Sequence, residues 1–375
     1  MPRALLVLTL LLLPAAVHAA APCRRLPLER PLRGATMVHL DDASDDNLAN
    51  DGLRGYGTES AAGMLRRLRG VGLTLVSLMA LGHLDHARDT TVRDERADPG
   101  KANDATLLAT MATAHHEGLA VLLVPHLWLA DGEWRGRITH PQGPDADAFF
   151  QSYGDFVEHV AQVAEQGCAE ALSIGVELKG LSTVPAHRAR FRDVISRVRA
   201  AFKGLVTYSA NWDELPDVTF LAELDVAGVN AFWPLHQRPG AGADELHAGA
   251  QSVARTLAEV HRKSGKRILL TEFGYKSVKD SAVRPWEWPG EAKVDALPGD
   301  EGYQALAYAA LLGAVAPAPW LEGVVVWFVP SDEKDPHREG RWEGPNGFSP
   351  LGKRAEAVLR AFCAGEGWRQ KARRK

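Results

Sequence analysis

Short apolar runs rich in Val, Leu and Ile alternate along the chain with longer segments in which apolar residues recur every three or four positions. The short runs predict strands that are buried on both faces, and the longer segments predict amphipathic helices. Strands are predicted at 35–40, 73–80, 120–127, 171–177, 205–211, 226–232, 267–272 and 323–329. Helices are predicted at 59–70, 102–117, 145–167, 187–202, 243–264, 301–315 and 351–364.

The alternation of strands and helices decides the fold class. Parallel strands need a crossover between them, usually a helix, and such crossovers are right-handed. Eight strands joined in this way close a (β/α)8 barrel, with a short turn at 214–224 in the one crossover that lacks a long helix. An open doubly wound sheet is the competing α/β topology, but no G-x-G-x-x-G fingerprint follows the first strand. We therefore expect a single-domain TIM barrel over 22–368.

The connections between the predicted elements differ in length at the two ends of this barrel. From helix to strand they are short, as at Gly70 to Gly72 and Lys203 to Gly204. Long loops that gather at one end of a rigid scaffold build a binding cleft, so the site is expected at the carboxyl ends of the strands. The long strand-to-helix connections are 41–58, 81–101, 128–144, 273–300 and 330–350.

Two predicted strands end on a glutamate at that same edge. Glu177 ends the fourth strand and Glu272 ends the seventh. A lone strand-end glutamate would more simply be a salt-bridge partner, but a matched pair favours catalysis. These two strands face one another across a barrel, and two opposed carboxyl groups are what the hydrolysis of a glycosidic bond requires.

The spacing of such a pair decides the reaction. A retaining enzyme holds the carboxyl groups about 5–5.5 Å apart, so that one protonates the leaving oxygen and the other attacks the anomeric carbon. We expect Glu177 to be the acid/base and Glu272 the nucleophile. We also expect Glu177 to be the less solvated of the two, because an acid near neutral pH needs a raised pKa.

Several sequence blocks, in order along nearly the whole chain, resemble a known family. They are Val124 to Ile138, Ile174 to Leu178, Tyr208 to Asp213, Gly228 to Leu235, Leu270 to Ser277 and Phe348 to Lys353. The chain resembles the retaining glycoside hydrolases of the (β/α)8 superfamily, and within them glycoside hydrolase family 113, known for endo-β-1,4-mannanases. The resemblance implies hydrolysis of β-1,4-mannan or a mannooligosaccharide without a cofactor. A glucan or chitosan-like substrate is the alternative.

One position departs from the superfamily pattern. The residue before the acid/base is usually an Asn that contacts the sugar 2-hydroxyl, whereas this chain has Val176, whose side chain forms no hydrogen bonds. Contacts to that hydroxyl strengthen in the transition state, so we expect another side chain to supply them. Asn211 and Asn230, at the ends of the fifth and sixth strands, are the candidates, although Asn is equally common as a turn cap.

His126 and Tyr275 are further candidates for polar contacts in the cleft. His126 ends the third strand and is expected to donate to a substrate hydroxyl or to Glu272, although a lone His is more often structural. Tyr275 lies three residues beyond Glu272. We expect it either to orient that carboxylate or to pack beneath the loop that follows.

Tryptophan is concentrated where the cleft is expected. Flat indoles bury the apolar C–H faces of sugar rings while their N–H groups find polar partners. Trp327, on the eighth strand, resembles the stacking platform beneath the reactive sugar, and the others are expected to act as substrate contacts or loop anchors. The tryptophans at strand ends or in strand-to-helix loops are Trp128, Trp134, Trp212, Trp233, Trp286, Trp288, Trp327 and Trp342.

The two ends of the chain carry signals of another kind. Residues 1–21 have a basic start, an apolar core and a small-residue cleavage site, as in a secretory signal peptide. We therefore expect a secreted or periplasmic monomer without a membrane segment once the signal is removed. The basic stretch 369–375 is expected to be a disordered tail. A net charge of −4 gives no basic surface of the kind that nucleic acid requires.

Three cysteines, Cys23, Cys168 and Cys363, leave at least one unpaired thiol. The two ends of a closed barrel meet, so we expect Cys23 to pair with Cys363 and Cys168 to be a buried free thiol. The cysteines lack the spacing of a zinc site. The acidic run 41–47 lacks the glycine and terminal glutamate of a calcium loop, so we expect a solvated acidic lip and no metal.

Two other function classes stay open at this point. A carbohydrate-binding barrel that has lost turnover would keep the cleft; Val176 favours it, whereas the two glutamates disfavour it. A barrel isomerase or aldolase would carry a phosphate-binding glycine loop after the seventh or eighth strand. The loop 330–350 is instead acidic and rich in Pro, which disfavours that class.

Overall fold

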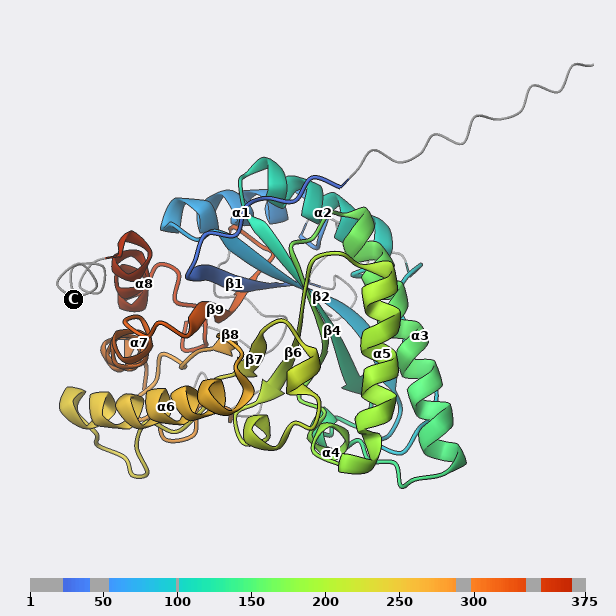
Figure 1. Cartoon of the computed structure of the whole chain (residues 1–375). Coiled ribbons are helices and arrows are strands. Elements are labelled where there is room, and N and C mark those ends of the chain that lie inside the picture. The colour runs from blue at the N-terminus through green and yellow to red at the C-terminus, as the bar shows by residue number, and fades with distance from the viewer. Residues whose placement is uncertain (1–22, 41–53, 99–100, 288–297, 335–344, 366–375) are drawn as a thin grey trace, which may run out of the picture.

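The computed structural model describes residues 23–40, 54–98, 101–287, 298–334 and 345–365. Its centre is a parallel barrel in which neighbouring strands follow the order of the chain (Figure 1). The first strand pairs with both the second and the last, so the ring is closed. The predicted TIM barrel is therefore confirmed. The barrel strands are β1 Leu32–Val38, β2 Leu75–Leu84, β4 Ala120–Leu129, β5 Ala171–Val176, β6 Leu205–Asn211, β7 Ala227–Asn230, β8 Ile268–Phe273 and β9 Leu321–Pro330.

One short strand was not predicted. β3, at Arg93–Asp94, lies in the loop that follows β2 and pairs with it antiparallel, with Gly82 opposite Asp94 and His83 opposite Arg93. The pairing adds a short antiparallel strand beside the carboxyl end of β2. Two residues are too few to leave a periodic pattern in the sequence, which is why the segment read only as part of a long connection.

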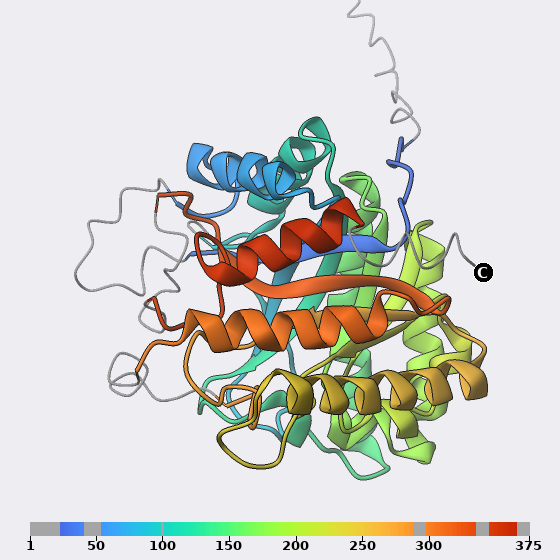
Figure 2. The ribbon, with the colours of Figure 1, turned by 90° about the vertical axis from the view of Figure 1, so that its left-hand side faces the viewer.

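Helices surround the barrel, and Figure 2 shows the last three long ones side by side on one flank. Their starts are fixed locally: the side chains of Thr58, Asn103 and Asp300 each accept a hydrogen bond from a backbone N–H in the first turn. The helices are α1 Glu59–Val71, α2 Asp104–His116, α3 Pro144–Gln166, α4 Lys179–Ser182, α5 Arg188–Ala201, α6 Ala243–Ser264, α7 Glu301–Val315 and α8 Arg354–Ala364.

The fifth crossover, between β6 and β7, contains only two short 3-10 turns, at Leu215–Asp217 and Leu221–Glu223. This agrees with the predicted turn at 214–224. Because this crossover has no long helix, the residues just after β6 pack directly against the barrel: Leu215 and Phe220 are fully buried. Glu214, which precedes the first turn, is also fully buried.

Two layers of apolar side chains fill the fold. The larger lies between the strands and the helices, and includes Leu65 and Leu68 of α1 and Phe149 of α3. The smaller is made from alternate strand residues and fills the barrel interior. Val176 belongs to this inner layer, so its side chain is part of the barrel packing and not of the cleft. The inner layer consists of Leu32, Leu75, Ala120, Leu122, Val124, Ala171, Val176, Val226, Leu269 and Val325.

The disulfide prediction was wrong. Cys23 pairs with Cys168, with 5.3 Å between their Cα atoms, and Cys363 is a buried free thiol. The segment before β1 passes the turn between α3 and β5, where the Arg25 Nε donates to the Ala169 carbonyl at 2.7 Å. Cys363 instead packs over Gly72, where a Cβ atom would lie 2.9 Å from that of the cysteine. The path of the N-terminal segment, and not the meeting of the chain ends, decides the pairing.

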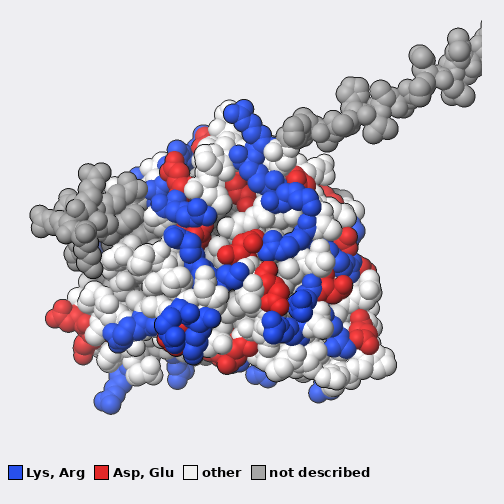
Figure 3. Space-filling view, in the orientation of Figure 1, with Lys and Arg blue, Asp and Glu red and all other residues white. Residues whose placement is uncertain are grey.

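Charge is mixed over the surface. On the face that Figure 3 shows, Lys and Arg side chains lie beside Asp and Glu side chains. Between α3 and α5 this mixture forms ion pairs, such as Arg197 with Glu158 at 2.6 Å and Arg190 with Asp147 at 2.5 Å. Among the helices of the described ranges, none has both the length and the apolar character needed to cross a bilayer.

Several predicted features fall on residues outside the described ranges. They are the signal peptide 1–21, the acidic run 41–47, Trp288, Trp342 and the basic tail 369–375.

Candidate active site

Glu177 directly follows β5, and the residues around it determine its unusual backbone conformation. The pairing of β5 with β6 shifts register between Ser173 and Val176, so the strand end is irregular. At Gly175 a Cβ atom would lie 2.2 Å from the Tyr153 hydroxyl, which leaves no room for a side chain. Glu177 itself has a positive φ of 52°, and its N–H donates to the Ser209 carbonyl at 2.9 Å.

Glu272 lies on β8, in register with Asn230 of β7. The Asn230 Nδ2 donates to Glu177 Oε1 at 3.0 Å. Its Oδ1 accepts from the Thr271 hydroxyl at 2.9 Å, which fixes the orientation of the amide. One asparagine is therefore bonded to Glu177 while it stands in register with Glu272 on the neighbouring strand.

The other oxygen of Glu177 faces the loop after β4. Trp134 Nε1 donates to Glu177 Oε2 at 2.9 Å, and Arg135 Nη1 lies 3.9 Å from the same oxygen. Arg135 is held by a hydrogen bond from its Nε to the Leu127 carbonyl and by its position 5.5 Å over the Trp128 ring. The sequence analysis missed Arg135. Its place directly after Trp134, in a block that resembles the family, was the available signal.

The two glutamates differ in burial, and in the direction opposite to the one expected. Glu272 is buried, whereas Glu177 is partly exposed. Burial and, next, the charge of Glu177 raise the pKa of Glu272 well above its ordinary value, against the smaller opposing effects of Arg135 and Asn230. The expectation that Glu177 is the less solvated carboxyl is therefore wrong, and it is Glu272 whose protonated form is favoured by its surroundings.

His126 lies at the floor of the mouth, on β4. Its ring stacks on Trp327 of β9 with 6.5 Å between ring centroids, and its Nδ1 has no hydrogen-bond partner among the described residues. Burial, together with the charge of Arg135, holds the pKa of His126 well below its ordinary value. The imidazole is therefore neutral, and its Nδ1 is available for a hydrogen bond. The peptide bond after Trp327 is cis.

Tryptophans line the mouth on both sides of the glutamates. Trp128 and Trp134 are 48% and 39% exposed on the β4 side. On the opposite side, Trp212 stacks with Trp286 at 5.4 Å and lies 6.1 Å from Trp233, both measured between ring centroids. Trp286 is 41% exposed. Large apolar side chains left exposed at a rim are suited to stacking on sugar rings.

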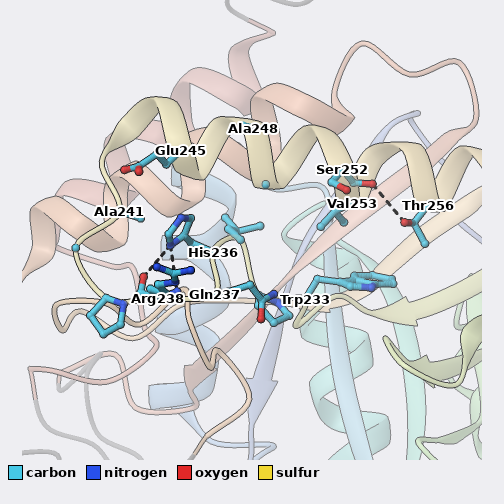
Figure 4. Close-up of a pocket in the computed structure, with 15 residues that line it drawn as sticks. Trp233, His236, Gln237, Arg238, Ala241, Glu245, Ala248, Ser252, Val253 and Thr256 are labelled. Atoms are coloured by element: carbon cyan, nitrogen blue, oxygen red, sulfur yellow. Dashed lines mark hydrogen bonds between the residues drawn. The ribbon is translucent and has the colours of Figure 1, made fainter.

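A hollow of about 790 Å³ lies beyond Trp233, between the β7–α6 loop and α6. Figure 4 shows His236 and Arg238 of the loop on one side, with Ser252 and Thr256 of α6 along the other. Neither Glu177 nor Glu272 lines it. This hollow and the carboxyl pair are therefore separate features, although Trp233 borders the hollow and lies next to Trp212 at the mouth.

Two predicted site residues have other partners in the structure. Tyr275 is fully buried against Tyr308 of α7, with 6.1 Å between ring centroids, and its hydroxyl has no hydrogen-bond partner among the described residues. It packs beneath the loop and does not orient Glu272, so the polar role expected of it is wrong. Asn211 donates from Nδ2 to Asp213 Oδ1 at 2.9 Å, and Asp213 also pairs with Lys179.

Within the described ranges, His, Cys, Asp and Glu side chains form no group of three that could hold a metal ion. The side chains at the mouth are a pair of carboxyl groups, an amide that is bonded to one of them, an indole N–H, a neutral imidazole and several exposed indoles.

Comparisons with known proteins identify the family of the chain. The model of Glycoside Hydrolase Family 113 matches residues 49–348. A GH113 β-mannanase from Alicyclobacillus acidocaldarius is 27% identical, with a TM-score of 0.72 over 89% of this chain and 97% of that one. A second solved GH113 β-1,4-mannanase is 23% identical, with a TM-score of 0.72 over 89% of this chain and 99% of that one.

A more distant structure shares the fold. A family 5 mannosidase from Rhizomucor miehei is 12% identical, with a TM-score of 0.57 over 89% of this chain and 92% of that one. No curated protein matches the chain. The family model covers most of the chain, and the family resemblance of the sequence blocks is confirmed. The chain belongs to glycoside hydrolase family 113 and is a glycoside hydrolase.

Proposed function

We propose that this glycoside hydrolase cleaves β-1,4-linked mannan with retention of anomeric configuration. Glu272 is the nucleophile and Glu177 the acid/base. The observation that carries the proposal is the proximity of the two carboxyl groups at the mouth of the barrel: Asn230 donates to Glu177 and stands in register with Glu272, and the charge of Glu177 raises the pKa of Glu272. The substrate class follows from the solved family members, which are described as β-mannanases.

The difference in exposure supports this division of roles. An acid/base has to reach the leaving oxygen and later an incoming water molecule, so it needs access to solvent. Glu177 has that access, and its Oε2 lies against Trp134 at the open rim. A nucleophile needs contact only with the anomeric carbon above it, and the buried position of Glu272 on the floor suits that role.

The reaction has two steps. In the first, an oxygen of Glu272 attacks the anomeric carbon, the bond to the glycosidic oxygen breaks, and Glu177 gives its proton to that oxygen. In the second, Glu177 takes a proton from water while the water oxygen attacks the same carbon, and the bond to Glu272 breaks. Two inversions at one carbon give net retention.

The first step requires an ionised Glu272 and a proton on Glu177. Burial and the charge of Glu177 raise the pKa of Glu272 and so favour its protonated form, which bound substrate has to offset. A glycosidic oxygen placed against Glu177 can accept a hydrogen bond only from the protonated carboxyl group. Positive charge that develops at the anomeric carbon favours the ionised form of Glu272. Bound substrate thus moves the proton of the coupled pair to Glu177.

Other side chains at the mouth supply binding contacts. His126 has a free Nδ1 and a neutral ring, which suits a hydrogen bond to a sugar hydroxyl. Trp327 lies beside it as a stacking surface for the reactive sugar. Trp134 combines an exposed ring with an N–H bonded to Glu177, so it can stack on a neighbouring sugar and orient the carboxylate at once.

We also propose that the enzyme acts as a monomer outside the cytoplasm, as the signal-like segment 1–21 suggests. The disulfide between Cys23 and Cys168 supports this location, because such bonds persist in oxidising compartments.

The reaction is tested by a hydrolysis screen on mannan, glucan, xylan and chitosan, with product anomers followed by NMR. We expect mannan to be cleaved with the β-anomer formed first. Net inversion would contradict the mechanism, and preference for another glycan would contradict the substrate. Loss of hydrolysis in Glu272→Ala with glycan affinity kept distinguishes an enzyme from a binding barrel, in which binding would be the only activity.

The roles of the two glutamates are tested by azide rescue with an activated β-mannoside. Azide fills the space left by the removed carboxyl group. It should therefore give the α-mannosyl azide with Glu272→Ala and the β-mannosyl azide with Glu177→Ala. The reverse pattern would exchange the two roles.

A further inference from the structure

Behind Glu177 runs a buried chain of hydrogen bonds that the two-step reaction does not use. The N–H of Leu178, the next residue, donates to the Tyr208 hydroxyl at 2.6 Å. That hydroxyl donates in turn to Glu214 Oε1 at 2.8 Å. Tyr208 and Glu214 are fully buried, and Leu178 is 1% exposed. The chain thus starts at the peptide group next to Glu177 and ends on a third carboxyl group.

The contacts on both sides of Glu177 come from β6. Its own N–H is bonded to the Ser209 carbonyl, and the following N–H is bonded to the Tyr208 side chain. Glu177 has the left-handed backbone conformation that residues other than Gly seldom adopt, so its orientation depends on such external support. Of these two backbone contacts, only the one with Tyr208 involves a side chain, and Glu214 is the hydrogen-bond acceptor that holds that side chain.

Glu214 is suited to act as a neutral acceptor. Burial raises its pKa to about 8, against the opposing effects of the Tyr208 hydroxyl and the Asn211 peptide. The charges that face it, Glu177 and Asp213, raise the pKa further. Its N–H donates to the Asn211 carbonyl at 3.1 Å, which ties the residue to the end of β6. Near neutral pH it is therefore a protonated carboxyl group whose oxygen accepts from Tyr208.

We propose that Tyr208 and Glu214 are positioning residues for proton transfer: they hold the peptide after Glu177 so that its carboxyl group reaches the glycosidic oxygen. This inference rests on the proposed acid/base role of Glu177. Tyr208 also packs against Phe220, with 5.2 Å between ring centroids, and lies 6.5 Å from Phe191. A purely structural role in that aromatic cluster is the alternative that an experiment has to separate.

The experiment compares two substrates in the same enzyme preparation. Cleavage of mannopentaose needs a proton on the leaving oxygen, whereas 2,4-dinitrophenyl β-mannobioside has a leaving group that departs without one. If Glu177 is misplaced, kcat/KM should fall for mannopentaose but not for the dinitrophenyl substrate. We compare kcat/KM because it reports the step that breaks the glycosidic bond. Partial unfolding slows both equally, so the ratio of the two kcat/KM values is independent of the folded fraction.

We expect Tyr208→Phe and Glu214→Leu to lower kcat/KM for mannopentaose about 10–100-fold. For the dinitrophenyl substrate, kcat/KM should stay within about twofold of the wild-type value. Glu214→Gln keeps a neutral acceptor for the Tyr208 hydroxyl and should keep the wild-type ratio. An equal fall on both substrates, no fall on either, or a Gln variant as defective as the Leu variant would overturn the proposal.

Tyr56→Phe is the matched control. The Tyr56 hydroxyl accepts from the Met79 N–H at 3.1 Å and donates to the Met37 carbonyl, so it also bridges buried backbone, but between β1 and β2. Its loss should leave the substrate ratio unchanged. In a Glu177→Gln background, Tyr208→Phe should change the ratio no further, because the group it positions is gone. If the wild type cleaves neither substrate, the proposed function fails; if it cleaves both, the variants test the inference separately.

Discussion

Asn230 donates to Glu177 at 3.0 Å and stands in register with Glu272, through an amide that the Thr271 hydroxyl holds in place. The sequence marked this asparagine as a candidate contact to the sugar 2-hydroxyl, in place of the missing donor at Val176. A position next to both carboxyl groups is compatible with that role.

Replacing Asn230 by Ala should lower kcat/KM for mannan about 100-fold, since it removes the donor to Glu177 and a polar neighbour that lowers the pKa of Glu272. Asn230→Asp should be at least as damaging, because a third carboxylate beside Glu272 raises the pKa of Glu272 further. Steady-state kinetics on mannooligosaccharides measure both. A fall of less than about threefold with Ala would show that the amide matters little.

The raised pKa of Glu272 should depend on its partner. In Glu177→Gln the like charge is lost, so the pKa of Glu272 should fall, although burial still holds it above the ordinary value. The variant can be followed on a dinitrophenyl β-mannoside, which needs no acid. The acidic limb of kcat/KM, which reports ionisation of the nucleophile, should move to lower pH. An unmoved limb would mean that burial alone raises the pKa.

Trp134→Phe keeps a flat ring but removes the N–H bonded to Glu177. We expect about a tenfold loss of kcat/KM, as for one hydrogen bond to a charged group. Trp128→Phe is the comparison, since Trp128 is also exposed at the rim but its ring contacts Arg135 instead. It should alter KM more than kcat. Identical profiles for the two variants would argue against an orienting role for Trp134.

Glu214 should make the fold less stable as pH rises. Its pKa of about 8 in the folded protein exceeds its ordinary value of 4.5, so between these values the unfolded chain binds fewer protons and gains stability. Glu214→Gln does not ionise in either state. Its stability relative to the wild type should therefore increase from pH 5 to pH 8, on the order of 3 kcal/mol. Chemical denaturation at both pH values measures this, and a pH-independent difference would contradict a buried neutral carboxyl group.

The Cys23–Cys168 bond closes a loop with a sequence separation of 145 residues. Replacing both cysteines by Ser should lower the free energy of unfolding by about 2–4 kcal/mol. Reductant should destabilise the wild type similarly and leave the double variant unaffected. Cys363→Ser is the control that keeps the bond. If that variant were the one that lost its sensitivity to reductant, the pairing described here would be wrong.

The fold and the position of the two glutamates at the strand ends could be predicted from the sequence because both depend on local patterns. Apolar runs that end on Glu177 and Glu272 record which strand delivers each carboxyl group. The positions of Arg135, Tyr208 and Glu214 could not be predicted in the same way, since their roles come from contacts between different strands and loops.

The errors share one cause, the path of the chain in space. Tyr275 has the right spacing from Glu272, but its side chain is directed toward α7. Which of the two glutamates is more exposed to solvent depends on how deeply the end of each strand is buried. The partner of Cys23 depends on the short segment before β1, which passes the α3–β5 turn. None of these directions leaves a periodic signal in the amino-acid sequence.

The covalent link between Cys23 and Cys168 also determines what a protease can achieve. A single cut anywhere from residue 24 to residue 167 leaves both fragments in one molecule, held at the base while the loops at the mouth are open to attack. Such a nicked enzyme would run as one species until it is reduced, and only then separate into two. The two fragments from a cut beyond residue 168 are not linked by this disulfide, so only non-covalent packing would hold them together.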